Sequence, residues 1–145
     1  VMYYKFMKIP IMKYLFRDGG VIPIAGRNEN EAIFNKAQET IEQALRDGDI
    51  LCIFPEGEIT QDGELAEFKR GIEHMLAMVP VPVIPMTLNG LWGSYFSRAH
   101  GGKALSNPRA LLKLWLRKIE LNIYESIPAD QVKAKDLEEF TKTKI

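Results

Sequence analysis

Apolar and polar residues follow one another along the first half of the chain in a pattern that predicts strand, helix and strand. Residues 21–24 form a short apolar run, and residues 50–54 form a second run that we expect to be a buried strand, with Cys52 as a small core residue. Asn28 or Asn30 can cap the intervening helix, and Gly48 can end it. The apolar residues of that helix recur at helical spacing and are Ile33, Phe34, Ala37, Ile41, Ala44 and Leu45. This order predicts a right-handed crossover between parallel strands.

The second half of the chain predicts a further crossover. A helix over residues 72–78 precedes an apolar run at 81–88 that prolines bracket, and this run is expected to be another buried strand. Apolar residues alternate with polar ones from 119 to 124, which predicts a half-buried strand, and the region after Pro128 predicts an exposed terminal helix. The pattern therefore predicts an α/β fold with a mostly parallel central sheet flanked by helices. We interpret residues 1–145 as a single domain that is truncated at its N-terminus, because the chain begins at Val1 inside sequence of structured character.

Composition excludes several classes of function. The 145 residues are 46% hydrophobic, and 19 basic residues balance 19 acidic ones, so no basic field indicates nucleic acid as a partner. The longest apolar stretch, 75–88, contains three prolines and is shorter than the roughly 20 residues of a membrane-spanning helix. Two histidines and one cysteine do not make a zinc site, and fingerprints for dinucleotides or phosphate-binding loops are absent. Neither a metal nor a cofactor is predicted.

The first 17 residues carry four basic side chains and no acidic one. Aromatic and aliphatic residues lie between these cations, and such a segment suits the interface of a membrane that contains anionic lipid. The alternative is a helix that packs on the domain with its lysines in solvent. The pattern leaves both interpretations open.

One carboxylate follows the predicted strand at 50–54. Pro55 ends that strand, Gly57 permits unusual backbone angles, and Glu56 lies between them. Ligands of open α/β sheets bind beyond the carboxyl ends of the strands, so Glu56 is well placed for a site. A polar turn with no further role is the alternative. If the strands at 21–24 and 50–54 are neighbours, Arg27 lies at the same edge of the sheet as Glu56.

Together these segments resemble the glycerolipid acyltransferases of the lysophosphatidic acid acyltransferase (PlsC-like) family. The blocks that carry the resemblance are Val-Ile-Pro-Ile followed by Arg27, Phe54-Pro55-Glu56-Gly57, and the Val-Pro-Val-Ile-Pro of residues 81–85. They correspond to three of the family's four blocks, in order, over roughly residues 15 to 90. The likeness is strongest to the bacterial branch related to 2-acylglycerophosphoethanolamine acyltransferase, whose members are often fused to transporter or synthetase domains.

The resemblance implies a role for each matching residue. Glu56 would be a supporting catalytic residue, while a histidine in a His-x-x-x-x-Asp block would be the general base. That block is absent, and we expect it to lie upstream of Val1, which would leave this fragment inactive alone. Arg27 would bind the acceptor's phosphate. The other residues implied in substrate binding are Phe54, Pro55, Glu56, Gly57, Thr60 and Pro85, and for Pro85 a purely structural role at a strand edge is equally open.

The sequence departs from the family pattern directly after Gly57. Most members have an arginine in one of the next two places, where this chain has Glu58 and Ile59. The missing cation weakens the case for a strongly phosphorylated acceptor, and Lys69 and Arg70 are candidates to replace it.

The resemblance also implies partners and a location. The donor would be an acyl group on coenzyme A or on acyl carrier protein, and the acceptor a lysophospholipid. The protein would work in phospholipid biosynthesis as a peripheral protein on the cytoplasmic face of the bacterial inner membrane. The alternative from another class is a non-catalytic lipid-binding module that retains the acyltransferase fold. Glu58 and the absent histidine favour that alternative, and the retained Phe-Pro-Glu-Gly favours the enzyme.

Overall fold

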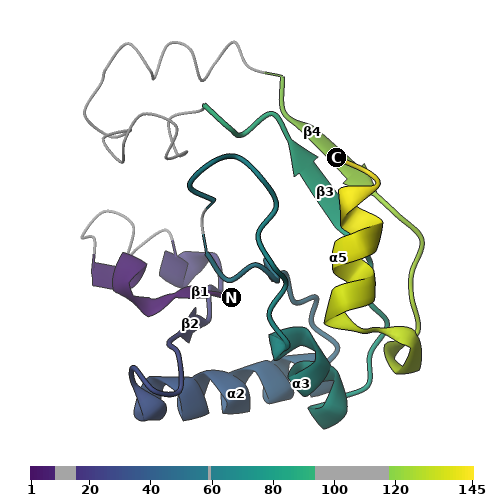
Figure 1. Ribbon diagram of the computed structural model, residues 1–145. Coiled ribbons are helices and arrows are strands. Elements are labelled where there is room, and N and C mark those ends of the chain that lie inside the picture. The colour runs from purple at the N-terminus through teal and green to yellow at the C-terminus, as the bar shows by residue number, and fades with distance from the viewer. Residues whose placement is uncertain (9–15, 59, 94–117) are drawn as a thin grey trace. The chain divides into compact units, whose positions relative to one another are not determined.

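The computed structural model of the protein describes residues 1–8, 16–58, 60–93 and 118–145. These residues form two compact units, one made of Val1–Pro55 with Gly71–Val81 and the other of Glu56–Arg70 with Pro82–Ile145. Each unit combines a two-stranded sheet with helix, so the structure is broadly α/β (Figure 1). Among the described residues, helices are all too short or too polar to cross a bilayer.

The first unit is organised around the helix α2, which spans Glu31–Arg46. Asn30 is its N-cap, because the Asn30 side-chain oxygen accepts a hydrogen bond from the Ile33 backbone N–H at 3.0 Å. Directly after the helix, Gly48 adopts a positive φ of 86°, the left-handed conformation that commonly ends helices. The helix and both of its predicted ends are confirmed, and the structure selects Asn30 rather than Asn28 as the cap.

The sheet of the first unit is short and parallel. Strand β1 (Met2–Tyr3) pairs with β2 (Pro23–Ile24), and the 3-10 helix η1 (Tyr4–Lys8) follows β1. The core of this unit lies between the sheet, α2 and the helix α3 (Gly71–Met78), which confirms the predicted helix over 72–78. Its buried residues are Ile22, Ala37, Ile41 and Met75. Ile41 is fully buried, so the apolar stripe of α2 faces this core.

The prediction of a buried strand over residues 50–54 is wrong. These residues belong to no described strand, and Ile50 and Phe54 are 99% and 64% exposed. Leu51 and Ile53 pack against the core, whereas Cys52 is exposed rather than a core residue. Apolar composition alone does not bury a segment on both faces: here Leu51 and Ile53 reach the core, while the alternate residues Ile50, Cys52 and Phe54 are exposed.

The second unit contains an antiparallel pair of strands. Strand β3 (Met86–Asn89) pairs with β4 (Glu120–Ile123), and an isolated bridge joins Val83 to Ile127 before it. The predicted strand at 81–88 therefore begins later than expected and lies antiparallel to β4, not in a second parallel crossover. Among the described residues the sheets are these two pairs, and an extended central parallel sheet is not among them.

The β3–β4 pair exposes the face that the sequence pattern predicts to be buried. Leu121 and Ile123 are 55% and 63% exposed, and Leu88, which is paired with Leu121, is also exposed. On the opposite face Thr87 is buried, and its hydroxyl lies 3.1 Å from the Tyr124 hydroxyl. The predicted strand at β4 is thus confirmed, but its apolar side chains, Leu121 and Ile123, are exposed rather than buried.

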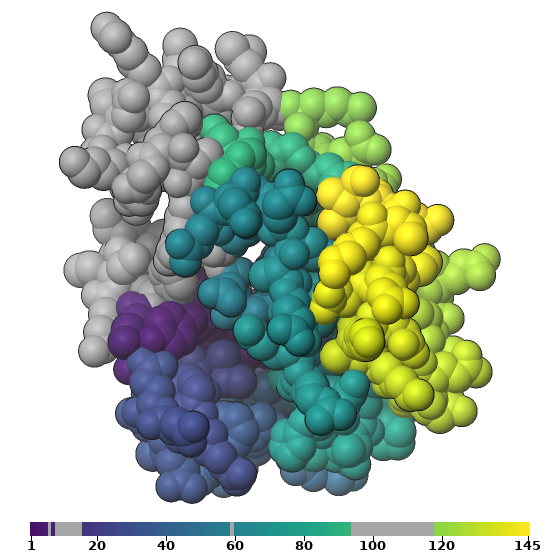
Figure 2. Space-filling model, in the orientation of Figure 1, coloured from purple at the N-terminus to yellow at the C-terminus, as the bar shows by residue number. Residues whose placement is uncertain are grey.

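The terminal helix α5 spans Ala134–Lys142, after the short 3-10 helix η3 (Ala129–Gln131). Ala134 and Leu137 are buried, and the Phe140 ring meets Tyr124 edge to face at 5.1 Å between centroids. The rest of the helix lies on the surface, and Figure 2 shows it in yellow. The predicted terminal helix is confirmed, and it packs on the Thr87 side of the β3–β4 pair.

Candidate functional site

The Phe-Pro-Glu-Gly block spans the boundary between the two units. Phe54 is largely exposed and Pro55 is half-buried, and both belong to the first unit. Glu56 and Gly57 follow in a turn that belongs to the second unit. Gly57 has a positive φ of 69°, so this turn uses a backbone conformation that residues with a side chain rarely adopt. In this turn the Glu56 side chain points toward the segment around Ala66, ten residues later in the chain.

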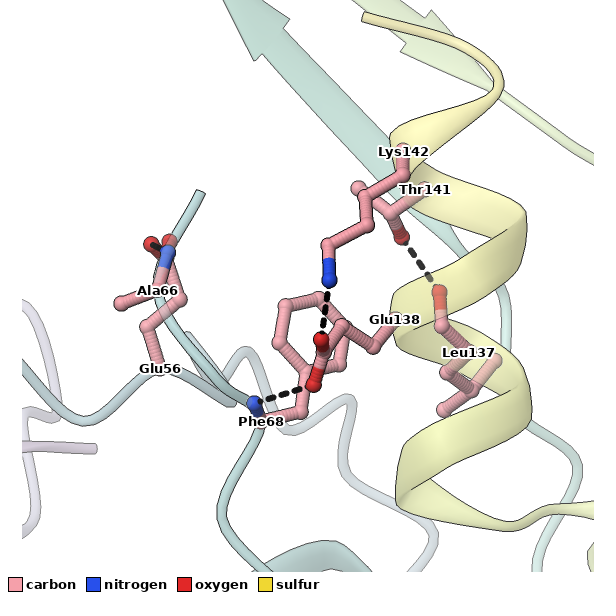
Figure 3. A network of polar contacts seen from close by, with 7 residues as sticks. All are labelled: Glu56, Ala66, Phe68, Leu137, Glu138, Thr141 and Lys142. Carbon is pink, nitrogen blue, oxygen red and sulfur yellow. Dashed lines mark hydrogen bonds and ion pairs between the residues drawn. The ribbon is translucent and has the colours of Figure 1, made fainter. Parts of the chain in front are cut away.

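The Glu56 carboxylate is held by the backbone of a segment ten residues away. Its Oε2 accepts a hydrogen bond from the Ala66 N–H at 2.8 Å, in a partly buried position (Figure 3). Ala66 lies in a stretch without helix or strand, so its N–H has no ladder partner and the carboxylate supplies one. A hydrogen bond to an ionised carboxylate is stronger than one between neutral groups. Glu56 is therefore an anchored carboxylate rather than a solvated turn residue.

Lys69 belongs to the same segment and lies against the turn. Its Cγ is 3.5 Å from the position that a Cβ on Gly57 would occupy, and its ammonium group is 3.6 Å from the Glu58 carboxylate. The structure thus places a cation beside the place where most family members have an arginine. Arg70 is exposed in the turn that precedes α3. The predicted substitution of the missing arginine by Lys69 has a geometric basis, although the binding role itself stays a prediction.

Thr60 is held in a small acidic loop. Its hydroxyl donates to the Asp62 carboxylate at 2.9 Å and accepts from the Gly63 N–H at 3.0 Å. The backbone N–H of Glu64 also bonds Asp62 at 3.0 Å, and this bond, helped by Thr60, lowers the pKa of Asp62. Thr60 therefore shapes the loop, and its hydroxyl is engaged within it.

A hollow of about 200 Å³ borders this loop. The residues that line it are Glu58, Thr60, Gln61, Asp62, Glu64, Leu65 and Ala66. Three of them are carboxylates and none is cationic, so the hollow itself does not suit a phosphate group. An anionic headgroup would fit better on the side of the turn where Lys69 lies.

Arg27 lies in the turn between β2 and α2, in the first unit. Its guanidinium carbon is 5.4 Å from the centroid of the Phe34 ring, a cation–π contact that restricts the side chain. A guanidinium held by its face still presents N–H donors at its edge, as phosphate binding requires. The predicted meeting of Arg27 and Glu56 at one edge of a sheet loses its premise, because residues 50–54 form no described strand. A role of Arg27 in phosphate binding stays a prediction.

Pro85 precedes β3 and takes part in the pairing of the strands. Its carbonyl accepts a hydrogen bond from the Tyr124 N–H at 3.0 Å, and a proline needs no acceptor for an N–H of its own. This contact supports the structural role for Pro85, and a role in a substrate pocket stays a prediction.

The basic N-terminal segment is partly neutralised by its own chain. Lys5 forms an ion pair with Glu29 at 2.8 Å, and Tyr3 and Tyr4 donate hydrogen bonds to the same carboxylate. The hydrogen bond from Lys5, followed by that from Tyr3, lowers the pKa of Glu29, and the same bond raises the pKa of Lys5. For residues 3–5 the structure thus favours packing on the domain. Residues 9–15 of the predicted interface lie outside the described residues.

One contact to the segment around Ala66 was not predicted from the sequence. The Glu138 carboxylate of α5 accepts a hydrogen bond from the Phe68 N–H at 2.9 Å, two residues after Ala66 (Figure 3). The sequence signal that was present is the spacing of Glu138 and Lys142, four residues apart on a helix. That spacing predicts the ion pair which the structure contains, but not the contact with a residue 70 positions earlier.

Residues 1–89 match the family model described as Acyltransferase, and they include the Phe-Pro-Glu-Gly block. The chain belongs to the Acyltransferase family. The resemblance to glycerolipid acyltransferases is thereby confirmed, whereas the assignment to the 2-acylglycerophosphoethanolamine branch stays a prediction. No solved structure matches the chain.

Curated relatives agree with the family assignment. The chain is 35% identical over 66 residues to a probable 1-acyl-sn-glycerol-3-phosphate acyltransferase of Mycoplasma pneumoniae, covering 46% of this chain and 25% of that protein. It is 29% identical to the chloroplastic 1-acyl-sn-glycerol-3-phosphate acyltransferase BAT2 of Brassica napus, covering 57% and 23%. It is also 34% identical to an N-acylphosphatidylethanolamine synthase of Arabidopsis thaliana, covering 54% and 27%. The matched region thus spans about a quarter of each relative.

The geometry of the family block indicates what the second unit can do. The second unit contains an anchored carboxylate, Glu56, and a lysine, Lys69, whose side chain contacts the adjacent Gly57. Among the described residues there is no group of three potential metal ligands.

Proposed function

We propose that this chain forms part of an enzyme that moves a fatty acyl group from an acyl thioester to a hydroxyl of a lysophospholipid or a related glycerol phosphate. The observation that carries the proposal is the match of residues 1–89 to the Acyltransferase family, with the Phe-Pro-Glu-Gly block intact and Glu56 anchored in it. Two of the relatives are named as 1-acyl-sn-glycerol-3-phosphate acyltransferases, which supports a phosphorylated glycerolipid as acceptor.

The proposed reaction is an ordinary acyl transfer. The acceptor's hydroxyl oxygen attacks the thioester carbonyl carbon while a general base takes the hydroxyl proton. The carbon–sulfur bond then breaks, an ester is formed, and the thiol of coenzyme A or of acyl carrier protein leaves with a proton. The general base would be a histidine oriented by an aspartate, in a His-x-x-x-x-Asp block that residues 1–145 do not contain. The described residues would bind and orient the acceptor.

Three residues divide that task in the proposal. Glu56, anchored by the Ala66 N–H, would accept a hydrogen bond from the acceptor's glycerol portion and orient the reacting oxygen. Lys69 would meet the acceptor's phosphate beside Gly57. Arg27, in the first unit, is a separate candidate for phosphate binding. Phe54, which is largely exposed, would offer apolar surface to the acyl chain.

The test is acyl transfer by the full-length protein that contains this chain, with acyl-coenzyme A and acyl-carrier-protein donors compared on lysophosphatidate and lysophosphatidylethanolamine. Glu56→Ala should lower kcat/KM by about a hundredfold, since a misplaced reacting group typically costs that much. Glu67→Ala is the matched control, because Glu67 is an exposed carboxylate on the same segment. Unchanged turnover by Glu56→Ala would remove Glu56 from the site.

One observation favours a second candidate, a lipid-binding module without catalysis. The hollow next to the block carries Glu58, Asp62 and Glu64, an acidic lining where phosphate-binding members have an arginine close by. The same assay separates the two functions. Full-length protein that binds a lysophospholipid, yet transfers no acyl group from either donor, would support the binding module and contradict the enzyme.

The proposal also places the protein on the cytoplasmic surface of a bacterial inner membrane, with fused transporter or synthetase domains as neighbours. Because Lys5 is paired with Glu29, the lysines at 8 and 13 should supply the attraction to anionic lipid. Lys8→Gln and Lys13→Gln, each made as a single variant, should weaken binding to phosphatidylglycerol vesicles about fivefold, at about 1 kcal/mol per lysine. Lys5→Gln should weaken it less. Equal effects from all three lysines would contradict this assignment.

A further inference from the structure

The segment between Ala66 and Lys69 contacts the Glu56–Gly57 turn at two points. The Ala66 N–H bonds the Glu56 carboxylate, and the Lys69 side chain lies over Gly57. The position of this segment therefore decides where the Glu56 carboxylate and the Lys69 ammonium stand relative to each other.

The segment has no regular secondary structure of its own to hold it. Residues 65–69 form neither helix nor strand, so their backbone N–H groups need acceptors from elsewhere in the fold. Between its two contacts with the turn, the Phe68 N–H bonds the Glu138 carboxylate at 2.9 Å. Figure 3 shows both carboxylates reaching this one strip of backbone, Glu56 from the turn and Glu138 from α5.

Glu138 is itself fixed on its helix. The Lys142 ammonium, one helical turn later, pairs with the other carboxylate oxygen of Glu138, and the Glu138 side chain is only 14% exposed. Neighbouring Leu137 is buried, so α5 is packed rather than free. A carboxylate with one oxygen on a lysine and the other on a backbone N–H has both acceptor atoms engaged and little rotational freedom.

We infer that Glu138 is a positioning residue for the acceptor site: through the Phe68 N–H it holds the segment that sets Lys69 and Glu56 around Gly57. This inference rests on the proposed function for its kinetic consequence, and on the structure alone for the contact. Helix α5 lies outside residues 1–89, so the family match does not contain this residue. The segment bears binding groups rather than the general base, so its displacement weakens acceptor binding before it affects the chemical step.

The variants separate the hydrogen bond from the charge. Glu138→Ala removes the acceptor, and Glu138→Asp keeps the charge but shortens the side chain by one methylene. Glu138→Gln keeps a side-chain oxygen at the same reach. Glu139→Ala, at an exposed neighbour on α5, is the matched control.

In the full-length protein, Glu138→Ala should raise KM for lysophosphatidate about tenfold, the usual scale of one charge-assisted hydrogen bond, with kcat changed less than twofold. KM for a monoacylglycerol, which lacks the phosphate, should rise less, because it loses only the contact of Glu56 with the glycerol portion. Glu138→Gln should recover most of the KM, and Glu138→Asp should not. If Glu138→Ala fails to fold, the Glu138→Asp and Glu138→Gln variants still show whether the length of the side chain or its charge is needed.

Amide hydrogen exchange provides a readout that needs no enzymatic activity. The Phe68 amide should exchange about tenfold faster in Glu138→Ala and Glu138→Asp, because its acceptor is lost, and near the wild-type rate in Glu138→Gln and Glu139→Ala. If the wild type transfers no acyl group, the proposed function fails while the exchange data still judge the contact. Faster exchange with an unchanged KM in an active enzyme overturns the positioning role. Wild-type exchange and KM in Glu138→Asp, with losses in Glu138→Gln, would overturn it as well.

Discussion

The Lys69 side chain lies directly over the backbone of Gly57, with its Cγ 3.5 Å from the point where a Cβ would be. The two residues are twelve positions apart in the chain. Gly57 is the residue after which most family members have an arginine, and this chain lacks that arginine. The ammonium group of Lys69 extends from there to Glu58, 3.6 Å away. A cation is therefore kept beside the turn although the local sequence no longer supplies it.

Lys69→Met should weaken binding of a phosphorylated acceptor while preserving the packing over Gly57. Methionine retains an apolar stem of similar length and lacks the ammonium group. We expect KM for lysophosphatidate in the full-length protein to rise about fivefold, since an exposed ammonium contributes about 1 kcal/mol. Lys118→Met, at another exposed lysine of the second unit, should leave KM unchanged. A matching rise in Lys118→Met would show that overall charge, not the site, is responsible.

Glu58→Gln should have the opposite effect. The substitution removes the carboxylate that pairs with Lys69 and frees the ammonium for an anionic ligand. KM for lysophosphatidate should fall about twofold to fivefold at low ionic strength, and the gain should shrink in high salt because the charges are exposed. A higher KM would show that Glu58 itself contacts the acceptor.

Gly57→Ala should destabilise the fold through its backbone rather than through a clash. A Cβ at this position meets Lys69 at ordinary contact distance, but a positive φ of 69° costs a residue with a side chain about 1 to 2 kcal/mol. Gly71→Ala is the matched control: the added Cβ meets nothing within 4 Å, and Gly71 starts the helix α3. Urea unfolding should show a loss for the first variant and no loss for the second. Equal free energies of unfolding would mean that the turn relaxes without strain.

Asn30→Ala should remove the N-cap of α2. The side-chain oxygen of Asn30 accepts from the Ile33 N–H, and loss of such a cap costs about 1 kcal/mol. Asn28→Ala, two residues earlier and exposed, should change the free energy of unfolding by less than half as much. Thermal unfolding followed by circular dichroism measures both. A larger loss of stability in Asn28→Ala would show that Asn30 is not the cap of α2.

Glu29 should make the stability of the fold depend on pH in the acid range. Hydrogen bonds from Lys5 and Tyr3 lower its pKa in the folded state below the ordinary 4.5. Its contribution is therefore fully present above about pH 4.5 and is lost as the pH falls through the lowered pKa of the folded state. Urea unfolding over a pH series from about 3 to 7 should show this loss in the wild type and a smaller one in Glu29→Gln. Parallel curves for the two proteins would mean that the ion pair does not stabilise the fold.

The sequence by itself determined those features that depend on neighbours along the chain. The helix α2 and its end at Gly48 follow from helical periodicity and from the conformational preferences of single residues, which also limited the cap to Asn28 or Asn30. The helices α3 and α5 and the existence of β4 follow in the same way. The acyltransferase family followed from three short blocks in the right order, and the match over residues 1–89 confirmed it.

Only the tertiary structure decided which faces are buried and which distant residues meet. Periodicity predicts that β4 has two different faces, but only the structure shows that α5 contacts Tyr124, on the side of the strand pair where Thr87 lies. Apolar residues at 50–54 form no described strand, because a ladder requires a partner with free N–H and C=O groups at the right place. Lys69 beside Gly57 and Glu138 on Phe68 arise from contacts 12 and 70 residues apart. The conformational preferences of neighbouring residues cannot specify such pairs, because each contact forms only when the tertiary fold brings two distant backbone segments together.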